Sequence, residues 1–78
     1  MKAMGLQEKM LNCIRKQGLP ATFFLVNGFR MKGLIKAFDD YTVLIECDGM
    51  QDLIFKHAIS TIMPSKPVDL HLLYGNVE

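Results

Sequence analysis

The segment from Phe55 to Thr61 holds the side chains best suited to chemistry in this chain. It reads Phe-Lys-His-Ala-Ile-Ser-Thr and places an ammonium, on Lys56, beside an imidazole, on His57, at the end of an apolar run. A lysine supplies a point charge for phosphate, and a histidine supplies a ring that can stack or hydrogen-bond. The pair therefore suits contact with a phosphate-bearing ligand.

Catalysis and metal binding have little support in the sequence. The second histidine, His71, lies in the C-terminal tail, and no Glu/Asp/His cluster or phosphate-binding glycine loop accompanies His57. Cys13 and Cys47 show neither a CxxC pattern nor Cys/His spacing. We predict no enzymatic activity, no cofactor, no metal and no small-molecule substrate, and a nuclease using His57 is the least favoured of three functions.

Size, charge and cysteine content narrow the class of protein. Seventy-eight residues make one small domain, and such domains often need oligomerisation for stability. The net charge is +1, but residues 1–36 carry seven basic and one acidic side chain, whereas residues 37–55 carry five acidic and no basic ones. This segregation favours a basic surface that attracts nucleic acid. Two isolated cysteines and no membrane-length apolar stretch predict a cytoplasmic protein with reduced thiols.

One helix is expected before the strands. Apolar side chains recur with helical spacing between Leu6 and Ile14, which predicts a helix over 6–17. Gly18 is a suitable C-terminal stop, and Pro20 prevents the helix from resuming. Residues 1–5 are expected to be flexible.

The remainder of the chain predicts five short strands. Asn27-Gly28 and Asp48-Gly49 are hairpin dipeptides, and Gly33 indicates a bend or bulge inside the longest strand. From Phe29 to Ala37, alternate side chains should share one face. The expected strands are 21–26, 29–38, 41–46, 50–55 and 60–63. The pattern predicts a mainly β fold, a bent five-stranded antiparallel open barrel over residues 6–64, followed by a tail over 65–78.

The last strand carries almost no charge, which matters because an open barrel has exposed edges. Pairing of this edge with a neighbouring chain, head to tail, would close a ring. In the tail, apolar side chains recur from Val68 to Tyr74. The tail is either loosely attached or a strip that docks on a ring or a partner.

Two blocks of sequence resemble the bacterial Sm-like RNA-binding family Hfq. The similarity covers roughly residues 6–67, and the Phe29 and Cys47 regions look like Gram-positive versions. The matching stretches are Leu6-Gln7, Leu25-Val26-Asn27-Gly28, Gly33, Phe38-Asp39, Lys56 to Thr61 and Pro64-Ser65. The resemblance implies an N-terminal helix on an Sm barrel, with six chains closing a ring through the fourth strand of one and the fifth of the next.

The resemblance also implies two RNA-binding faces and a basic rim. The proximal, helix-bearing face would take uridine-rich single strands through Gln7, Tyr41, Lys56 and His57, with Asp40 standing where an amide is common. A carboxylate there repels phosphate and lacks a donor. The distal face would take adenine-rich RNA, and the expected residues are Phe24, Gly28, Phe29, Arg30, Met31, Lys32 and Thr61, with Asp52 replacing a usual amide. The implied rim lies near the end of the helix, and only Arg15 and Lys16 match the basic residues that the family has there.

The leading functional hypothesis is an RNA chaperone. It would hold small regulatory RNAs and messenger RNAs on separate faces of a homohexamer and so promote their pairing. The second hypothesis is a protein-interaction adaptor that uses strand edges or the apolar tail and has no affinity for RNA. Alternation places Phe23 and Phe24 on opposite faces of one strand, and we expect Phe24 to face outward.

Overall fold

A computed structural model describes residues 5–69 and 71 of the chain. Helix α1 spans Leu6–Gln17, the predicted bounds, and ends at Gly18, whose φ of 64° is left-handed. The Gly18 N–H donates to the Arg15 carbonyl at 3.1 Å, and the Leu19 N–H donates to the Ile14 carbonyl at the same distance. These bonds satisfy the free carbonyls of the last turn, because glycine adopts a left-handed conformation without a steric penalty.

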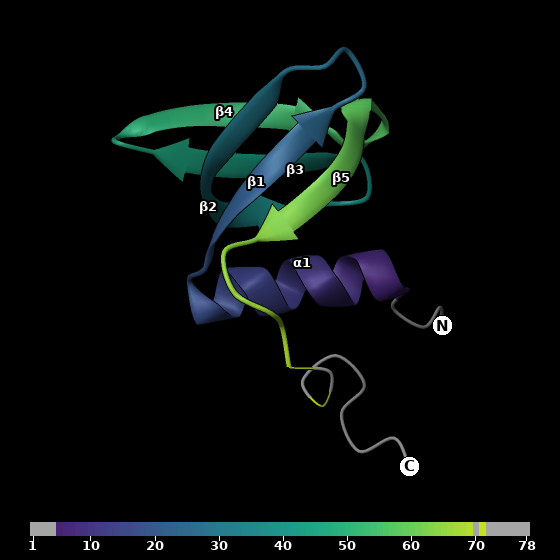
Figure 1. The fold of residues 1–78 in the computed structure, drawn as a ribbon, viewed down its shortest axis with the longest axis vertical. Coiled ribbons are helices and arrows are strands. Elements are labelled where there is room, and N and C mark those ends of the chain that lie inside the picture. The colour runs from purple at the N-terminus through teal and green to yellow at the C-terminus, as the bar shows by residue number, and fades with distance from the viewer. Residues whose placement is uncertain (1–4, 70, 72–78) are drawn as a thin grey trace.

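Five strands follow in one antiparallel sheet, shown in Figure 1. The strands are β1 (Pro20–Leu25), β2 (Arg30–Phe38), β3 (Thr42–Cys47), β4 (Met50–Phe55) and β5 (Ile59–Pro64), with a 3₁₀ turn, η1 (Lys56–Ala58), before the last. Their order in the sheet is β4-β3-β2-β1-β5, so β4 and β5 are the two edges. The fold class and the strand count agree with the prediction, and the strand ends agree with it to within one residue.

The core lies between α1 and the concave face of the bent sheet (Figure 1). Helix α1 and strands β1 to β4 contribute buried hydrophobic side chains, and Phe23 on β1 is the largest of those that are fully buried. The buried residues are Leu11, Ile14, Ala21, Phe23, Ile35, Val43, Ile45 and Ile54. Phe24, the next residue, is only half-buried on the other face of the strand, as the alternation of side chains predicts.

The irregularity in β2 lies further along the strand than predicted. Gly33 sits against β3 so closely that a Cβ there would lie 2.8 Å from the Glu46 carbonyl oxygen. The glycine is thus explained by close strand approach, but the register shift falls between Ile35 and Ala37. An inserted residue inverts the alternation of side chains beyond it. Ala37 is therefore exposed and Phe38 half-buried, which corrects the expectation that Ala37 shares a face with Ile35.

The chain ends are described only in part. Residues 1–4 of the expected flexible N-terminus, and residues 70 and 72–78 of the expected tail, lie outside the described residues. Within the described part of the tail, Val68 packs against the core cluster, and the Ser65 N–H donates to the Pro20 carbonyl at 2.9 Å. No helix among residues 5–69 is long and apolar enough to cross a membrane.

Candidate functional site

A groove of about 520 Å³ opens between α1 and β5; we call it the helix-side groove. Gln7 reaches it from the first turn of α1, and Lys56 reaches it from η1. The other lining residues are Leu6, Met10, Leu11, Val43, Ile59, Ser60, Thr61 and Ile62. An apolar groove with a few polar groups is suited to hold a flat ring such as a nucleobase. Gln7 and Lys56, 49 positions apart in the chain, are therefore brought together.

The Lys56 ammonium is the most unusual group in this groove. The side chain is only 10% exposed, and Nζ has no hydrogen-bond partner among the residues that the structure describes. The nearest carboxylate oxygen, Glu8 Oε2, lies 3.9 Å away, which is an ion pair but too long for a hydrogen bond. Nζ also lies 5.5 Å from the centroid of the Phe38 ring, within range of a cation–π interaction. The charge is thus compensated, while its N–H donors have no acceptor among the described residues.

Tyr41 is placed by a turn that Asp39 organises. The Asp39 Oδ1 accepts hydrogen bonds from the Tyr41 N–H at 2.9 Å, the Thr42 N–H at 2.8 Å and the Thr42 hydroxyl at 2.8 Å. The Tyr41 carbonyl then accepts the Lys56 N–H at 2.7 Å, which fixes Tyr41 next to Lys56. The Tyr41 side chain is 76% exposed, so its ring is free to stack with a base.

The same bonds lower the pKa of the Asp39 carboxyl below its usual value of 3.8, chiefly through the Tyr41 N–H and then the Thr42 hydroxyl and N–H. A carboxyl whose pKa is lower in the folded state stabilises the fold at pH values above its usual pKa. This stabilisation is lost as the pH falls through the folded-state pKa. Asp39→Asn, which keeps an acceptor but no charge, should be less stable than the wild type at neutral pH and equal to it in acid.

Urea unfolding between about pH 7 and about pH 3 measures this difference. Asp40→Asn in the same turn is the matched control, since the Asp40 side chain is exposed beside the same residues. A difference between wild type and Asp39→Asn that stays constant with pH, or that Asp40→Asn reproduces, would contradict the assigned role of Asp39.

His57 and Asp40 do not line the helix-side groove, but each is next in the chain to a predicted uridine-binding residue, Lys56 and Tyr41 respectively. The His57 ring stacks on Phe55, with centroids 5.9 Å apart and planes at 18°. This contact presents an exposed imidazole beside Lys56. Asp40 is exposed in the turn before Tyr41. Thr61, which the sequence places among the adenine-binding residues, pairs with Phe24 between β5 and β1, so the two side chains share a face of the sheet. The residue also contributes to the lining of the helix-side groove.

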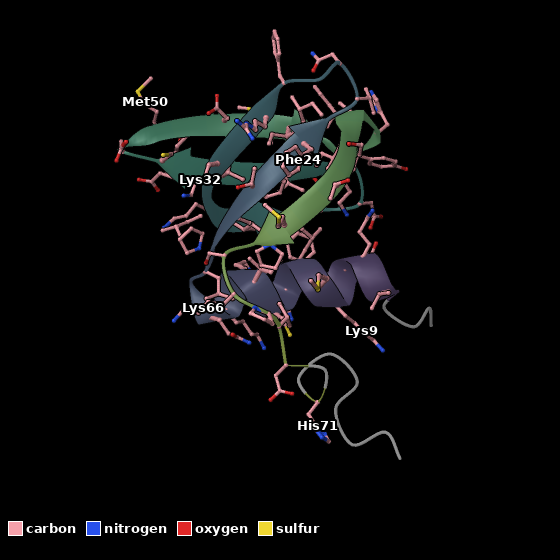
Figure 2. All side chains as sticks on the ribbon, viewed as in Figure 1. Lys9, Phe24, Lys32, Met50, Lys66 and His71 are labelled. Carbon is pink, nitrogen blue, oxygen red and sulfur yellow. The ribbon has the colours of Figure 1, made fainter. Side chains whose placement is uncertain are left out.

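A second depression, of about 350 Å³, lies where β2, β1 and β5 adjoin; we call it the sheet hollow. It shares no lining residue with the helix-side groove, and Figure 2 shows Phe24 and Lys32 on the sheet above α1. Its lining residues are Thr22, Phe24, Arg30, Met31, Lys32 and Met63. Four of the predicted adenine-binding residues, Phe24, Arg30, Met31 and Lys32, therefore converge.

The other predicted distal residues surround this hollow or lie apart from it. Gly28 and Phe29 occupy the β1–β2 turn, where the Phe29 N–H donates to Asn27 Oδ1 at 3.0 Å and the Phe29 side chain is 69% exposed. This turn leads directly into Arg30. Asp52 lies on β4, paired with Ile45, and does not line the hollow.

The rim residues meet a third depression, of about 280 Å³, formed by Asn12, Arg15, Lys36, Ala37 and Phe38. The Arg15 guanidinium donates to Asn12 Oδ1 at 2.7 Å, and Lys36 Nζ lies 3.7 Å from Glu46 Oε1. Lys16 is exposed in the last turn of α1 and does not line this depression. Both cations of the depression thus already have polar neighbours, which leaves a weakly basic rim.

Glu8, Thr22 and Met63 are among the residues at these sites that sequence reasoning missed. Glu8 follows Gln7 directly. An acidic residue in the first turn of a helix is typical of helix stabilisation, so the sequence alone did not indicate a binding-site role for it. Thr22 and Met63 join the sheet hollow because residue Thr22 pairs with both Lys32 and Met63 across the sheet. Strand alternation places Thr22 on the same face as Phe24, but only the β1–β5 register brings Met63 beside it.

The fold has counterparts among solved structures. A crystal structure described as the pleiotropic translational regulator Hfq superimposes with a TM-score of 0.73 and 42% identity, covering 76% of this chain and 98% of that one. An Hfq protein from Anabaena sp. matches with a TM-score of 0.69 and 29% identity, covering 76% of this chain and 95% of that one. The protein is thus Sm-like, with an N-terminal helix on a bent five-stranded sheet.

The comparisons of sequence define the family. The family model described as "Hfq protein" matches residues 6–69, and this chain belongs to the Hfq family. "RNA-binding protein Hfq" from Bacillus licheniformis is 53% identical over 72 residues, which cover 92% of this chain and 99% of the relative. The protein of that name from Desulfitobacterium hafniense is 51% identical over 67 residues, covering 86% and 81%. This is a family of RNA-binding proteins, not of enzymes, as predicted.

Proposed function

We propose that this protein binds single-stranded RNA on two separate surfaces and acts as an RNA chaperone in post-transcriptional regulation. The observation that carries this proposal is the helix-side groove, which Gln7 and Lys56 line among apolar residues. The Lys56 side chain is only 10% exposed, and its ammonium has no hydrogen-bond partner in the described residues. A buried cation without a hydrogen bond is costly unless a ligand completes its bonding. A base carbonyl would do so.

The helix-side groove is the proposed site for uridine-rich strands. Tyr41 would stack on a base, Gln7 and Lys56 would read its polar edge, and His57 would contact ribose or phosphate. The exposure of the Tyr41 ring and the backbone hydrogen bond that ties it to Lys56 support these roles. Asp40 is exposed where a phosphate would pass and would weaken, not replace, these contacts.

The sheet hollow is the proposed site for adenine-rich strands. Phe24 would stack on a purine, and Arg30 and Lys32 would contact the backbone. The neighbouring turn contributes Gly28 and the exposed Phe29 ring. With two sites that share no lining residue, one protein could hold a small regulatory RNA and a messenger RNA together and raise their effective concentration.

We propose that six chains form a ring by pairing β4 of one chain with β5 of the next. Both strands are sheet edges, and they expose the large apolar side chains Leu53, Phe55 and Met63 at 57%, 53% and 52%. Exposed apolar edges favour strand addition by a second chain. The domain over residues 6–64 would form the ring, with residues 65–78 as a tail outside it. We expect this assembly in the cytoplasm, where Cys13 and Cys47 would stay reduced.

The first test is fluorescence anisotropy over a salt series, with labelled U-rich, A-rich and C-rich RNAs of six nucleotides and longer. Native mass spectrometry measures the number of protein chains in the ring. We expect submicromolar, salt-sensitive binding of U-rich and A-rich RNA and weaker binding of C-rich RNA. We expect the mass of six protein chains for the ring. Binding of A-rich RNA alone would indicate that Asp40 has disabled the helix-side groove. No binding of any of the three at low salt would overturn the proposal and favour the adaptor alternative.

A further inference from the structure

We infer that Glu8 is a specificity-determining residue of the helix-side groove, where it makes Lys56 a reader of base carbonyls and excludes the phosphate backbone. The inference rests on the proposed function and concerns a residue to which the sequence analysis gave no role. It follows from the distance between Glu8 and Lys56, the burial of Lys56 and the apolar lining of the groove.

The Glu8 carboxylate lies between the Lys56 ammonium and Gly5. Oε2 lies 3.9 Å from the Lys56 ammonium, and Oε1 turns back over Gly5, where an added Cβ would lie 3.1 Å away. Gly5 precedes the first helical residue and provides no side-chain cap, so the helix N-terminus also favours a negative charge at Glu8. The carboxylate, 36% exposed, thus stays between a helix terminus and a buried cation.

This arrangement compensates the charge of Lys56 but does not use its donors. At 3.9 Å, Glu8 attracts the ammonium without accepting a hydrogen bond from it, and no other described residue accepts one. A neutral carbonyl oxygen entering the groove gains that hydrogen bond and is not repelled by Glu8. A phosphate would gain the same bond but would bring a second negative charge within a few ångströms of the carboxylate.

The apolar lining favours the same ligand. Leu6, Met10, Val43, Ile59 and Ile62 line the same groove as Lys56, and they suit the face of a base better than a hydrated phosphate. Uracil carries two carbonyl oxygens on its polar edge, cytosine has one, and adenine has none. The groove therefore selects a keto pyrimidine, and Glu8 keeps the backbone outside.

The test compares Glu8→Gln with the wild type for U6 RNA and for an abasic hexamer that carries ribose and phosphate but no bases. Glutamine keeps the side-chain length and suits this helix position. In Glu8→Gln, we expect affinity for the abasic strand to rise about fivefold for each Lys56 that a phosphate reaches. This factor corresponds to removing the repulsion between two unit charges about 4 Å apart in water. The salt slope for that strand should steepen by about 0.7 per phosphate gained. The preference for U6 over the abasic strand should fall accordingly.

Two variants separate this effect from a change in net charge or folding. Glu46→Gln removes an acid that also pairs with a lysine, Lys36, at 3.7 Å, but outside the groove. It should leave the preference for U6 unchanged. Glu8→Asp keeps the charge and should retain wild-type selectivity, and thermal unfolding checks that all three variants fold.

The outcomes distinguish the inference from the function on which it rests. Wild-type protein that binds U6 tightly, together with a Glu8→Gln variant of unchanged selectivity, would overturn the inference alone. An equal gain of abasic binding in Glu46→Gln would also overturn it, because the effect would then be general electrostatics. A wild-type protein that does not bind U6 at low salt would overturn the proposed function and the inference with it.

Discussion

Alanine in place of Phe24 is expected to weaken binding of adenine-rich RNA by about fivefold to 150-fold for each adenine that loses its stacking partner. Uridine-rich RNA should bind as before, because Phe24 lines only the sheet hollow and the helix-side groove shares none of its residues. Anisotropy titrations of both RNAs against both proteins, at one salt concentration, measure the two effects together.

Alanine in place of Lys56 is the reciprocal change. It removes the donors of a charged group in the helix-side groove, and hydrogen bonds of that kind correspond to about tenfold to 150-fold in affinity. We expect this loss for uridine-rich RNA, with adenine-rich binding retained. If either variant weakened both RNAs equally, the two depressions would not be separate sites. If neither variant changed any affinity, RNA would bind elsewhere on the protein.

The second large effect concerns stability. Phe23→Ala should lower the free energy of unfolding by about 3–5 kcal/mol, the usual cost of truncating a buried phenylalanine. Phe23 is fully buried and is the largest side chain of the core cluster. For a small domain this is a large part of the total stability, so the variant should melt at a much lower temperature or fail to fold.

Phe24→Ala is the matched control, since it removes the same side chain one residue along the same strand. Because Phe24 is half-buried on the opposite face, its loss should cost less stability than the loss of Phe23 while weakening adenine-rich binding. Chemical unfolding at equal protein concentration measures the difference, since a ring would be more stable at higher concentration. Equal destabilisation by the two substitutions would contradict the assignment of one face to the core and the other to RNA.

The elements of this fold follow local patterns that the sequence carries openly. Helix α1 was predicted with its observed bounds because apolar side chains recur every third or fourth residue and Gly18 then ends the pattern. The Asp48-Gly49 dipeptide forms the predicted two-residue hairpin, with positive φ at both positions. These features depend on residues close together in the chain, so one sequence was enough to find them.

The register shift in β2 was not predictable in this way. The sequence marked Gly33 as the irregular position, whereas the shift lies between Ile35 and Ala37, where β2 pairs with β3. An inserted residue in one strand is defined only by its partner strand, and alternation within β2 alone contains no sign of it. The exposure of Ala37 was therefore mispredicted, and Phe38 approaches Lys56 for the same reason.

The sequence by itself determined the element types, the outward face of Phe24 and, through its motifs, the family and most of the proposed RNA-binding residues. Tertiary structure alone decided that the Lys56 ammonium is buried with no hydrogen-bond partner among the described residues, that Glu8 compensates its charge, and that Met63 joins the sheet hollow. The physical reason is sequence separation. Helical and strand periodicity order neighbours along the chain, whereas the environment of a charge depends on residues that only the packing of α1 against the sheet brings within a few ångströms.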